Sequence, residues 1–492
     1  MRGEIRFLRR GKVVRLTSPT LTLLDHLRLT ERATGTKEGC AEGDCGACTV
    51  VLRRLRGDKL TYEPVNACIL FAAQADGADV ITVEDLAKDG DLHPVQQQMV
   101  DLHGSQCGFC TPGFVMALFA LYHQPRARSI DRATVNDWIA GNLCRCTGYR
   151  PIVDAGLAAC ALPASDWFTA QEADARKALA ELKDTDDVFI GTRERFLAAP
   201  ATVLSLAKLY FANPDATIIA GATDVGLWVT KQLRQFQKVI FLHRVRGLDE
   251  IEDRHDAVSF GATVTHAQAM PYLTAVDRDL GELMRRFAGN QVRMAGTIGG
   301  NVANGSPIGD LPPALIALGA TLALQRGERP RTMPIENFFL DYGKQDRQAG
   351  EFVRMVRIPK FTAGEQFRCY KISKRFDSDI SAVMGAFKLR LDGQRIAGAR
   401  IGFGGMAAIP KRARATEKAL IEARLDRPQT WDDGVAALAE DFAPIDDMRA
   451  SASYRLEVAR ALLRKALTEI GGTPTRTTRV TGFREAADVG AA

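Results

Sequence analysis

Eight of the ten cysteines lie within the first 150 residues, and their spacing constrains this 492-residue chain more than any other feature. The first group comprises Cys40, Cys45, Cys48 and Cys68, and the second comprises Cys107, Cys110, Cys144 and Cys146. Nearly all residues between Cys40 and Cys48 are small. Glycines there permit positive φ angles and let backbone N–H groups point inward at sulfur. Each group is therefore expected to converge on a shared centre.

The spacing of the first group is typical of a plant-type 2Fe–2S ferredoxin site, and we predict a second 2Fe–2S site for the other group. Three alternatives compete. A disulfide framework needs an oxidising compartment, and the N-terminus shows no secretion signal. A four-cysteine zinc site usually pairs two C-x2-C knuckles, which neither group does. Eight unrelated core cysteines would not cluster so tightly. Cys160 and Cys369 remain, and we predict buried thiols for both.

The bulk properties exclude several classes of protein. A length of 492 suggests about three domains. The net charge of +6 is small and no long basic run appears, which argues against a nucleic-acid binder. No apolar stretch is long enough to span a membrane. Cysteines in cluster spacing fit a reducing compartment, so we expect a cytoplasmic protein.

The patterns along the chain divide it into six segments. Short strands, helical stretches at 21–29 and 67–75 and the first cysteine loop predict a ferredoxin-like β-grasp domain. Four apolar-periodic stretches, at 94–103, 114–122, 133–140 and 151–161, predict a helical domain in which two helix–loop–helix units each offer two thiolates. A polar, Ala- and Glu-rich stretch at 163–187 is predicted to be a linker. The predicted domains are 1–88, 89–162, the linker 163–187, 188–362, 363–470 and a tail, 471–492, expected to be extended or disordered.

Two glycine-rich turns mark the segment after the linker. A buried strand runs from Ala216 into a small-residue turn at Gly221–Thr223, where free backbone N–H groups can receive a phosphate. A similar stretch, 295–301, continues through 304–310 into a helix predicted over 312–324. There is no G-x-G-x-x-G fingerprint, so a Rossmann site is not expected. Two tight structural turns remain the alternative interpretation. Residues 367–470 read as strands followed by helices.

These motifs together resemble the iron–sulfur/FAD part of the xanthine dehydrogenase family, within the molybdenum hydroxylase superfamily. The similarity covers about residues 3–470 and is closest to the small subunit of bacterial two-subunit enzymes. It is carried by GTKEGCAEGDCGACTV, HGSQCGFCTPGF, GNLCRCTGYRPI, IIAGATDVGLWVT, TIGGNVANGSPIGDLPPALIALGA and KISKRFDSDISAV. The resemblance implies a multidomain α+β fold: a β-grasp 2Fe–2S ferredoxin domain, a four-helix 2Fe–2S domain, a non-Rossmann (PCMH-type) α+β FAD-binding domain and a C-terminal α+β domain.

The resemblance also assigns site residues. The first cysteine group would hold the cluster nearer the flavin, and the second the cluster nearer molybdenum. The residues implied to bind FAD are Ile218, Ile219, Ala220, Gly221, Ala222, Thr223, Asp224, Val225, Phe287, Thr297, Ile298, Gly299, Gly300, Asn301, Asp310, Val353 and Lys371. Gln106 would face the pterin of a partner's cofactor. Taken singly, Phe287 could be core, Asp310 a helix cap, Lys371 a solvated strand residue and Gln106 a loop amide.

The implied function is electron transfer. The molybdopterin-binding part exceeds what three modest domains can hold, so the molybdenum site and the catalytic residues would lie on a large partner subunit, in a dimer of heterodimers. That partner would hydroxylate xanthine or hypoxanthine to urate, and electrons would pass through two 2Fe–2S clusters to FAD and then to NAD+. We expect NAD+ near the Ser306–Asp310 loop and a strand at 371–379. Ser378 lies between Asp377 and Asp379, where some animal relatives are acidic.

Two alternatives stay open. The same parts serve enzymes that oxidise aldehydes, N-heterocycles or CO, although in many of those the cluster and FAD domains are separate chains. A redox sensor is the non-catalytic alternative, and the sequence offers no DNA-binding helix or signalling domain.

Overall fold

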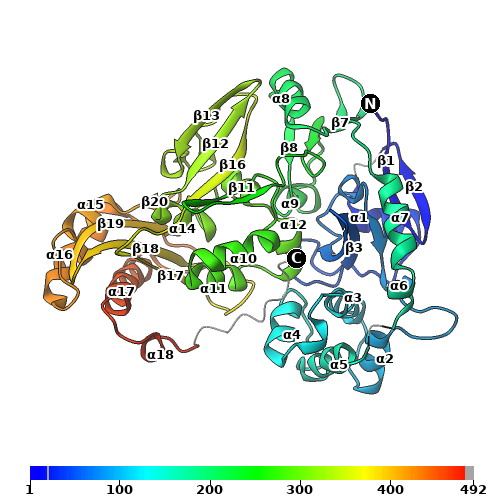
Figure 1. The fold of residues 1–492 in the computed structure, drawn as a ribbon, viewed down its shortest axis with the longest axis horizontal. Coiled ribbons are helices and arrows are strands. Elements are labelled where there is room, and N and C mark those ends of the chain that lie inside the picture. Colours follow the sequence, from blue (N-terminus) through cyan, green and yellow to red (C-terminus); the bar gives the residue numbers. More distant parts are fainter. Residues whose placement is uncertain (19–20, 164, 482–492) are drawn as a thin grey trace.

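The structure is a computed structural model that describes residues 1–18, 21–163 and 165–481. Figure 1 shows the N-terminal and helical parts in blue and cyan on one side, a green middle part, and the orange and red C-terminal part on the other side. We name these the N-terminal unit (1–85), the helical unit (86–163), the middle unit (188–361) and the C-terminal unit (365–478). The expected multidomain α+β fold is confirmed.

The N-terminal unit is one mixed sheet with strand order β2-β1-β5-β3-β4. Its strands are β1 (Ile5–Arg9), β2 (Lys12–Leu16), β3 (Thr49–Arg56), β4 (Lys59–Asn66) and β5 (Asp79–Ile81). The short helical turns α1 (Leu23–Asp25) and η1 (His26–Thr30) pack Leu23 and Leu27 against Phe7 and Leu52. This sheet with its covering helix is the predicted β-grasp arrangement.

Residues 67–75 were predicted as a helix, and this is wrong except for a short turn, η2 (Ala72–Ala75). The N–H groups of Ile69 and Leu70 both donate to the carbonyl of Asn66, while the carbonyl of Leu70 accepts from Leu23. The first two bonds form a single helical turn at Cys68, and the bond from Leu23 occupies the carbonyl that a continuing helix would use for Gln74.

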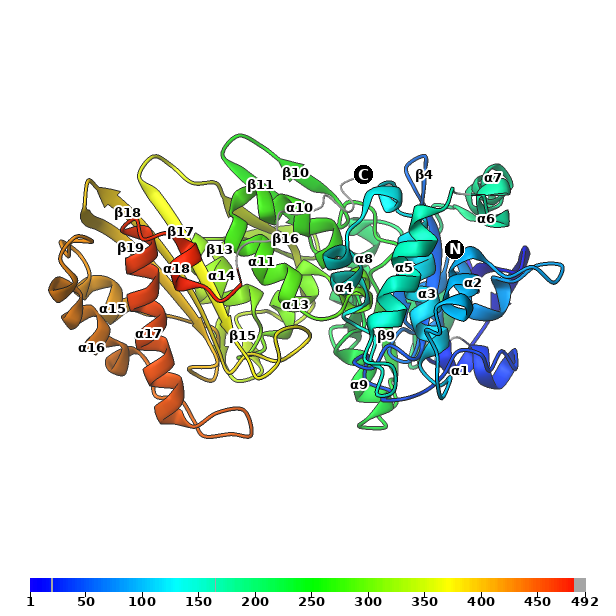
Figure 2. The same ribbon diagram turned by 90° about the horizontal axis from the view of Figure 1, so that it is seen from below.

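The helical unit contains the four predicted helices: α2 (Pro94–Asp101), α3 (Thr111–Tyr122), α4 (Arg132–Ile139) and α5 (Arg150–Ala161). Figure 2 shows α3 and α5 running alongside each other, with α2 and α4 near them. Helix α3 begins directly after Cys110 and is buried from Gly113 to Tyr122. Helix α5 begins four residues after Cys146, so each cysteine pair leads into a helix.

The predicted linker contains two helices, α6 (Trp167–Ala170) and α7 (Glu172–Leu182). Leu179 and Leu182 of α7 pack on Leu8 of the N-terminal sheet. Ahead of α6, the buried carboxylate of Asp166 receives a 3.2 Å hydrogen bond from His93 Nε2. The backbone N–H of Val95 donates to His93 Nδ1, which places the ring proton on Nε2. This hydrogen bond therefore fixes the start of the linker segment to the helical unit.

The middle unit is built on two large sheets and a two-stranded one, β14 (Phe339–Asp341) with β15 (Lys344–Gln345). The four-stranded sheet has order β6-β7-β9-β8 and the five-stranded sheet β10-β11-β16-β12-β13. The strands are β6 (Val188–Gly191), β7 (Phe196–Ala199), β8 (Thr217–Ile219), β9 (Lys238–Phe241), β10 (Ile251–Asp253), β11 (Ala257–Gly261), β12 (Thr321–Arg326), β13 (Arg329–Pro334) and β16 (Glu351–Pro359). The helices are α8 (Val203–Ala212), α9 (Val225–Thr230), α10 (His266–Val276), α11 (Arg278–Arg286), α12 (Asn290–Ala295), α13 (Ile298–Asn304) and α14 (Leu311–Leu318).

The helix predicted over 312–324 is wrong beyond Leu318. Helix α14 ends at Gly319, which adopts a left-handed conformation with φ of +79°. Thr321 then starts β12, whose residues pair with both β13 and β16. A left-handed glycine is a common helix stop, and an apolar run alone does not reveal it.

The C-terminal unit is a four-stranded sheet, β17-β18-β19-β20, covered by helices. Its elements are β17 (Glu365–Ile372), β18 (Val383–Asp392), β19 (Arg395–Gly404), β20 (Lys411–Arg412), α15 (Arg414–Ala419), α16 (Asp432–Asp441), α17 (Ala452–Ile470) and α18 (Thr475–Thr478). The predicted strands and helices of this region are present. The tail prediction is wrong at α18, and residues 482–492 lie outside the described part. No helix among the described residues combines the length and apolarity needed to cross a bilayer.

Candidate functional site

The first cysteine group converges in one loop. The side chain of Cys40 interacts directly with those of Cys45 and Cys68, and Cys68 also interacts with Cys48. Backbone N–H groups point at sulfur: that of Cys45 donates to Cys40 Sγ at 3.3 Å and that of Cys40 to Cys45 Sγ at 3.4 Å. A side chain on Gly39 would lie 2.8 Å from Cys45 Sγ, so this position must stay small.

The close contact between the thiols shifts their pKa values in opposite directions. Hydrogen bonds from Cys45 and Cys68 hold the pKa of Cys40 far below its usual range. The interaction with Cys40 in turn raises the pKa of Cys45 and of Cys68 far above that range. A thiolate is the form that binds metal, and a cationic centre would allow all four thiols to ionise. Four converging sulfurs with inward N–H donors fit a 2Fe–2S cluster.

The second cysteine group lies at the surface. Cys110 interacts with Cys144, and Cys146 interacts with Cys107. Burial, then the hydrogen bond with Cys144, raises the pKa of Cys110 to about 12. The N–H of Thr147 donates to Cys144 Sγ at 3.5 Å, while Cys107 and Cys146 are exposed. The predicted grouping of four and four matches these contacts, and their role as iron ligands stays a prediction.

The state of the cysteines bears on the disulfide alternative and on the two cysteines outside the groups. All ten cysteines lie in the described part of the chain and are free thiols, which disfavours a disulfide framework. Cys160 and Cys369, outside the two groups, are buried as expected.

A cavity of about 470 Å³ lies among the predicted FAD residues, within the size range of small-molecule sites. Two glycine-rich turns form one wall. The first follows β8 and includes Gly221, Ala222 and Thr223, and the second surrounds Thr297 and Gly300. A side chain on Gly221 would lie 2.1 Å from the carbonyl oxygen of Ala295, so the turns meet backbone to backbone. Ala222 has a φ of +61°, which the turn requires.

Phe287 lines the cavity beside His266, with the two ring centroids 4.7 Å apart. Phe287 follows the end of α11, and Arg293 fixes it by donating to the carbonyls of Arg285, Phe287 and Ala288. His266 is buried, and its Nδ1 has no partner among the described residues. Asn301 Oδ1, also at the cavity, has none either. Unpartnered buried polar atoms around a cavity fit a polar ligand such as FAD.

Most residues predicted to bind FAD border this cavity. They are Ile218, Ala220, Gly221, Ala222, Thr223, Asp224, Val225, Phe287, Thr297, Gly299, Gly300, Asn301 and Val353. Ile219 and Ile298 instead point into hydrophobic cores. Asp310 and Lys371 are buried against each other, and neither is among the residues that line the cavity. Gln106 is exposed beside Cys107. The binding roles of these residues stay predictions.

Sequence reasoning missed several residues that line the cavity. Tyr210, Arg347 and Glu351 are among them, and Arg347 donates to Tyr210 Oη and to the carbonyl of Glu351. These residues come from α8, from the loop before β16 and from the first residue of β16, far apart in the chain. No local motif marks them, and His266 is likewise a single histidine without a spacing pattern.

The segment after Lys371 is a loop, because β17 ends at Ile372, so the strand expected over 371–379 is wrong. This loop crosses to the iron–sulfur side. Arg375 lies 3.8 Å from Asp44 in the first cysteine loop, and Ser378 Oγ lies 3.5 Å from the carbonyl of Ala140. Burial raises the pKa of Asp44, partly opposed by Arg375.

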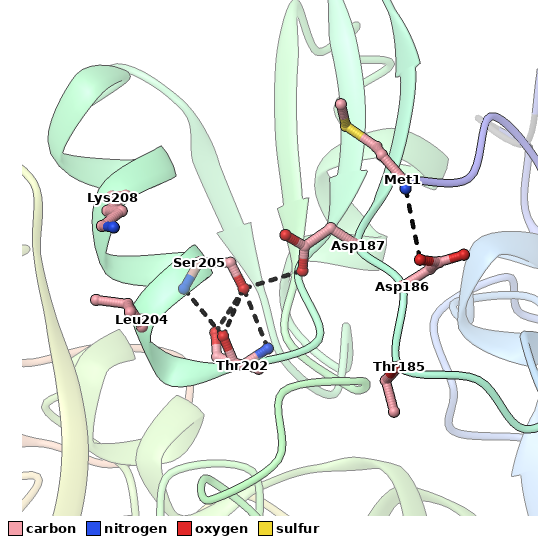
Figure 3. A pocket seen from close by; sticks show the side chains of 8 residues that line it. All are labelled: Met1, Thr185, Asp186, Asp187, Thr202, Leu204, Ser205 and Lys208. Carbon is pink, nitrogen blue, oxygen red and sulfur yellow. Dashed lines mark hydrogen bonds and ion pairs between the residues drawn. The ribbon is translucent and has the colours of Figure 1, made fainter.

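A second hollow, of about 360 Å³, lies at the start of α8 (Figure 3). Its polar groups are already matched: the Met1 ammonium contacts Asp186, and Ser205 Oγ donates to Asp187. We assign no ligand to it.

Three family models match successive parts of the chain. They are "[2Fe-2S] binding domain" at 82–157, "FAD binding domain in molybdopterin dehydrogenase" at 193–361 and "CO dehydrogenase flavoprotein C-terminal domain" at 368–470. Xanthine dehydrogenase of Emericella nidulans is 31% identical over 89% of the chain and 36% of its own length. The chain belongs to the molybdenum hydroxylase family.

Within the molybdenum hydroxylase family the chain corresponds to the iron–sulfur and FAD part. Rat xanthine dehydrogenase/oxidase is 32% identical over 78% of the chain and 33% of its own length. The chain therefore spans about a third of the curated relatives it matches.

Solved structures match only part of the chain. Carbon monoxide dehydrogenase from Hydrogenophaga pseudoflava is 27% identical with a TM-score of 0.52, covering 56% of this chain and 97% of that one. Quinoline 2-oxidoreductase from Pseudomonas putida is 25% identical with a TM-score of 0.51, covering 56% and 95%.

Proposed function

We propose that this chain is the electron-transfer subunit of a xanthine dehydrogenase. In this proposal a large partner subunit holds the molybdopterin-bound molybdenum and oxidises xanthine or hypoxanthine. When bound, two 2Fe–2S clusters and FAD would supply the electron-carrying chemistry, with NAD+ as the final acceptor.

The observation that carries this proposal is the order in which the three sites touch. Helix α9, which borders the cavity, also contacts the first cysteine loop, because Thr230 Oγ1 donates to the carbonyl of Ala41 at 2.7 Å. The first loop contacts the second, because the N–H of Leu143 donates to the carbonyl of Cys45 at 2.9 Å. The cavity, the first group and the second group therefore form one continuous series, and the second group ends it at the surface.

The surface around the second group suits a partner. Phe109 and Leu143 are large apolar residues next to these cysteines in the sequence, with exposed fractions of 48% and 40%. Exposed apolar side chains that flank exposed Cys107 and Cys146 are typical of a docking surface. The partner's molybdenum site would meet this face, with Gln106 beside it. The heterotetramer expected from the resemblance is part of the same proposal.

The choice of xanthine rests on how the relatives cover the chain. The xanthine dehydrogenases of Emericella nidulans and rat match 89% and 78% of it. The carbon monoxide and quinoline enzymes match 56% of it, although the match covers 97% and 95% of their own chains. Fusion of both parts in one chain favours the first class. Oxidation of CO, an aldehyde or an N-heterocycle is the second candidate, supported by the match at 368–470.

The chain's own residues would hold and orient the cofactors. The cysteines would ligate iron, the turns at Gly221 and Thr297 would receive the FAD phosphates, and Phe287 would pack on the flavin. NAD+ would approach the flavin near the Ser306–Asp310 loop. Free thiols fit a reducing compartment, so we place the protein in the cytoplasm.

The test is purification from the native host, followed by measurement of iron, flavin, molybdenum and co-purifying chains. We expect about four irons and one FAD per chain together with a molybdenum-containing partner. The complex should reduce NAD+ with xanthine. Reduction with quinoline, CO or an aldehyde alone would favour the second candidate, and zinc in place of iron or absence of flavin would contradict both.

A further inference from the structure

Four glycines from three different units meet at one point in the molecule. Gly46 lies in the first cysteine loop, Gly113 follows Cys110, Gly141 precedes Cys144, and Gly289 follows Phe287. A side chain on Gly113 would lie 2.2 Å from the carbonyl oxygen of Gly46, and one on Gly46 would lie 2.3 Å from that of Gly141. One on Gly289 would lie 2.4 Å from the Cα of Gly141. The three backbones therefore touch where none tolerates a side chain.

The side chain of Gln291 lies at the centre of this junction. It is 1% exposed, and it extends from α12 in the middle unit. Its Nε2 donates to Asn142 Oδ1 at 2.7 Å and to Thr49 Oγ1 at 3.1 Å. Asn142 belongs to the helical unit and Thr49 to the N-terminal unit, so one amide group bonds to both other units.

Asn142 and Thr49 in turn bond to one shared acceptor in the first cysteine loop. Asn142 Nδ2 donates to the carbonyl of Gly46 at 3.0 Å, and Thr49 Oγ1 donates to the same carbonyl at 2.6 Å. Gln291 thus reaches the peptide next to Cys45 through either partner. All of these groups are buried, where hydrogen bonds are strengthened and losses are costly.

Each bonded residue lies within a few positions of a proposed cofactor ligand in the sequence. Gln291 lies four residues after Phe287 and six before Thr297, Asn142 lies two before Cys144, and Thr49 follows Cys48. A shift at the junction would move the cavity wall and both cysteine loops relative to one another. The side chain needs two N–H donors on a short stem to reach both acceptors, which Gln provides and Leu, Met and Glu do not.

We propose that Gln291 is a positioning residue that fixes the relative placement of the flavin cavity and the two cysteine groups for electron transfer. This inference rests on the proposed function, because it assumes that both clusters and FAD are bound. It predicts an effect on transfer between cofactors rather than on their retention.

The test uses the holoenzyme purified from its native host, as wild type and as Q291L. Q124L is the matched control, because Gln124 Nε2 also joins two units, at Tyr62 and Ala120, away from the junction. Iron and flavin are counted first. The flavin is then reduced by a photogenerated deazaflavin radical, and the rate at which electrons reach the clusters is followed optically. The magnetic coupling of the two reduced clusters is measured by EPR.

We expect full iron and flavin in Q291L, a flavin-to-cluster rate lowered on the order of tenfold and altered EPR coupling, since small misplacements at a reacting centre cost large factors in rate. Q124L should match wild type. A wild-type rate and wild-type coupling in Q291L would overturn the inference, and so would loss of iron or flavin, which would assign Gln291 to cofactor retention.

If Q291L does not fold, Q291E, which keeps the side-chain shape but has no N–H donor, is judged by the same criteria. Absence of iron or flavin from wild type would instead defeat the proposed function itself.

Discussion

Lys371 Nζ and Asp310 Oδ2 face each other in a buried ion pair, 2.5 Å apart, between the end of β17 and the start of α14. The two side chains are 2% and 4% exposed, and Ser381 Oγ donates to the other oxygen of Asp310. Both residues were predicted to contact FAD, and the structure places them against each other, joining the middle and C-terminal units.

We therefore expect K371M to destabilise the protein by about 3–5 kcal/mol, because it leaves a buried carboxylate without its cation. The double variant K371M/D310L should recover much of this loss, since an apolar pair can replace a buried ion pair. Urea unfolding of the three proteins, followed by fluorescence, measures the difference. Equal stability of K371M and wild type would show that water or another group compensates Asp310.

Substitution of one cysteine in either group should remove one cluster and leave the other. C68S, in the first group, and C110S, in the second, are each expected to lower iron from about four to about two per chain. C160S is the control, because Cys160 is buried and belongs to neither group. Iron analysis and EPR of the reduced proteins check this. Full loss of iron in either variant would mean that the two sites do not form independently.

His266 should make stability depend on pH. Burial, and then the nearby positive charge of Arg293, lowers the pKa of His266 to about 3. The unfolded chain binds this proton with a pKa of about 6.5 and the folded protein binds it more weakly, so stability is complete above about pH 6.5 and falls as the pH drops. The slope from this one group is about 1.4 kcal/mol per pH unit within that window.

The variant H266F should therefore lose less stability than wild type between about pH 7 and pH 5. Thermal unfolding at several pH values measures this, with H255F as the control because His255 is exposed. Parallel pH dependence in wild type and H266F would contradict the assignment of a buried neutral imidazole.

A methyl group on Gly221 should separate the two turns of the cavity. It would meet the carbonyl oxygen of Ala295 at 2.1 Å, which is backbone and cannot rotate away. We expect G221A to lower flavin content severalfold while both clusters stay loaded. G3A is the control, because nothing lies within 4 Å of the added Cβ at Gly3. Flavin absorbance per iron is the measurement, and unchanged flavin in G221A would show that the turns do not hold it.

Local patterns predicted much of this molecule. The cysteine spacing, the four helices between 94 and 161 and the turn after β8 are set by neighbours in the chain. Contacts between segments that are far apart in the chain could not be predicted from the sequence. The pair of Lys371 with Asp310 and the place of Tyr210 at the cavity depend on how the units pack.

The glycines also show that local patterns do not reveal contacts between units. We explained those in the cysteine loops by positive φ and inward N–H groups, and Gly46 does have a φ of +68°. Its close approach to Gly141 in another unit is a second requirement that no local pattern contains. The helix expected to reach 324 was wrong for the opposite reason, because Gly319 acts locally but lies inside a continuous apolar run.

The contrast between the two cysteine groups implies an order of assembly. Cys48 and Cys68 are 1% and 2% exposed, and Gly226 of α9 packs directly on Ile69, next to Cys68. Docking of the middle unit covers the side of the first group formed by Cys48 and Cys68, while Cys40 and Cys45 stay partly exposed. We therefore expect iron and sulfide to reach the first group more easily before the middle unit docks, whereas Cys107 and Cys146 stay accessible until a partner closes over them.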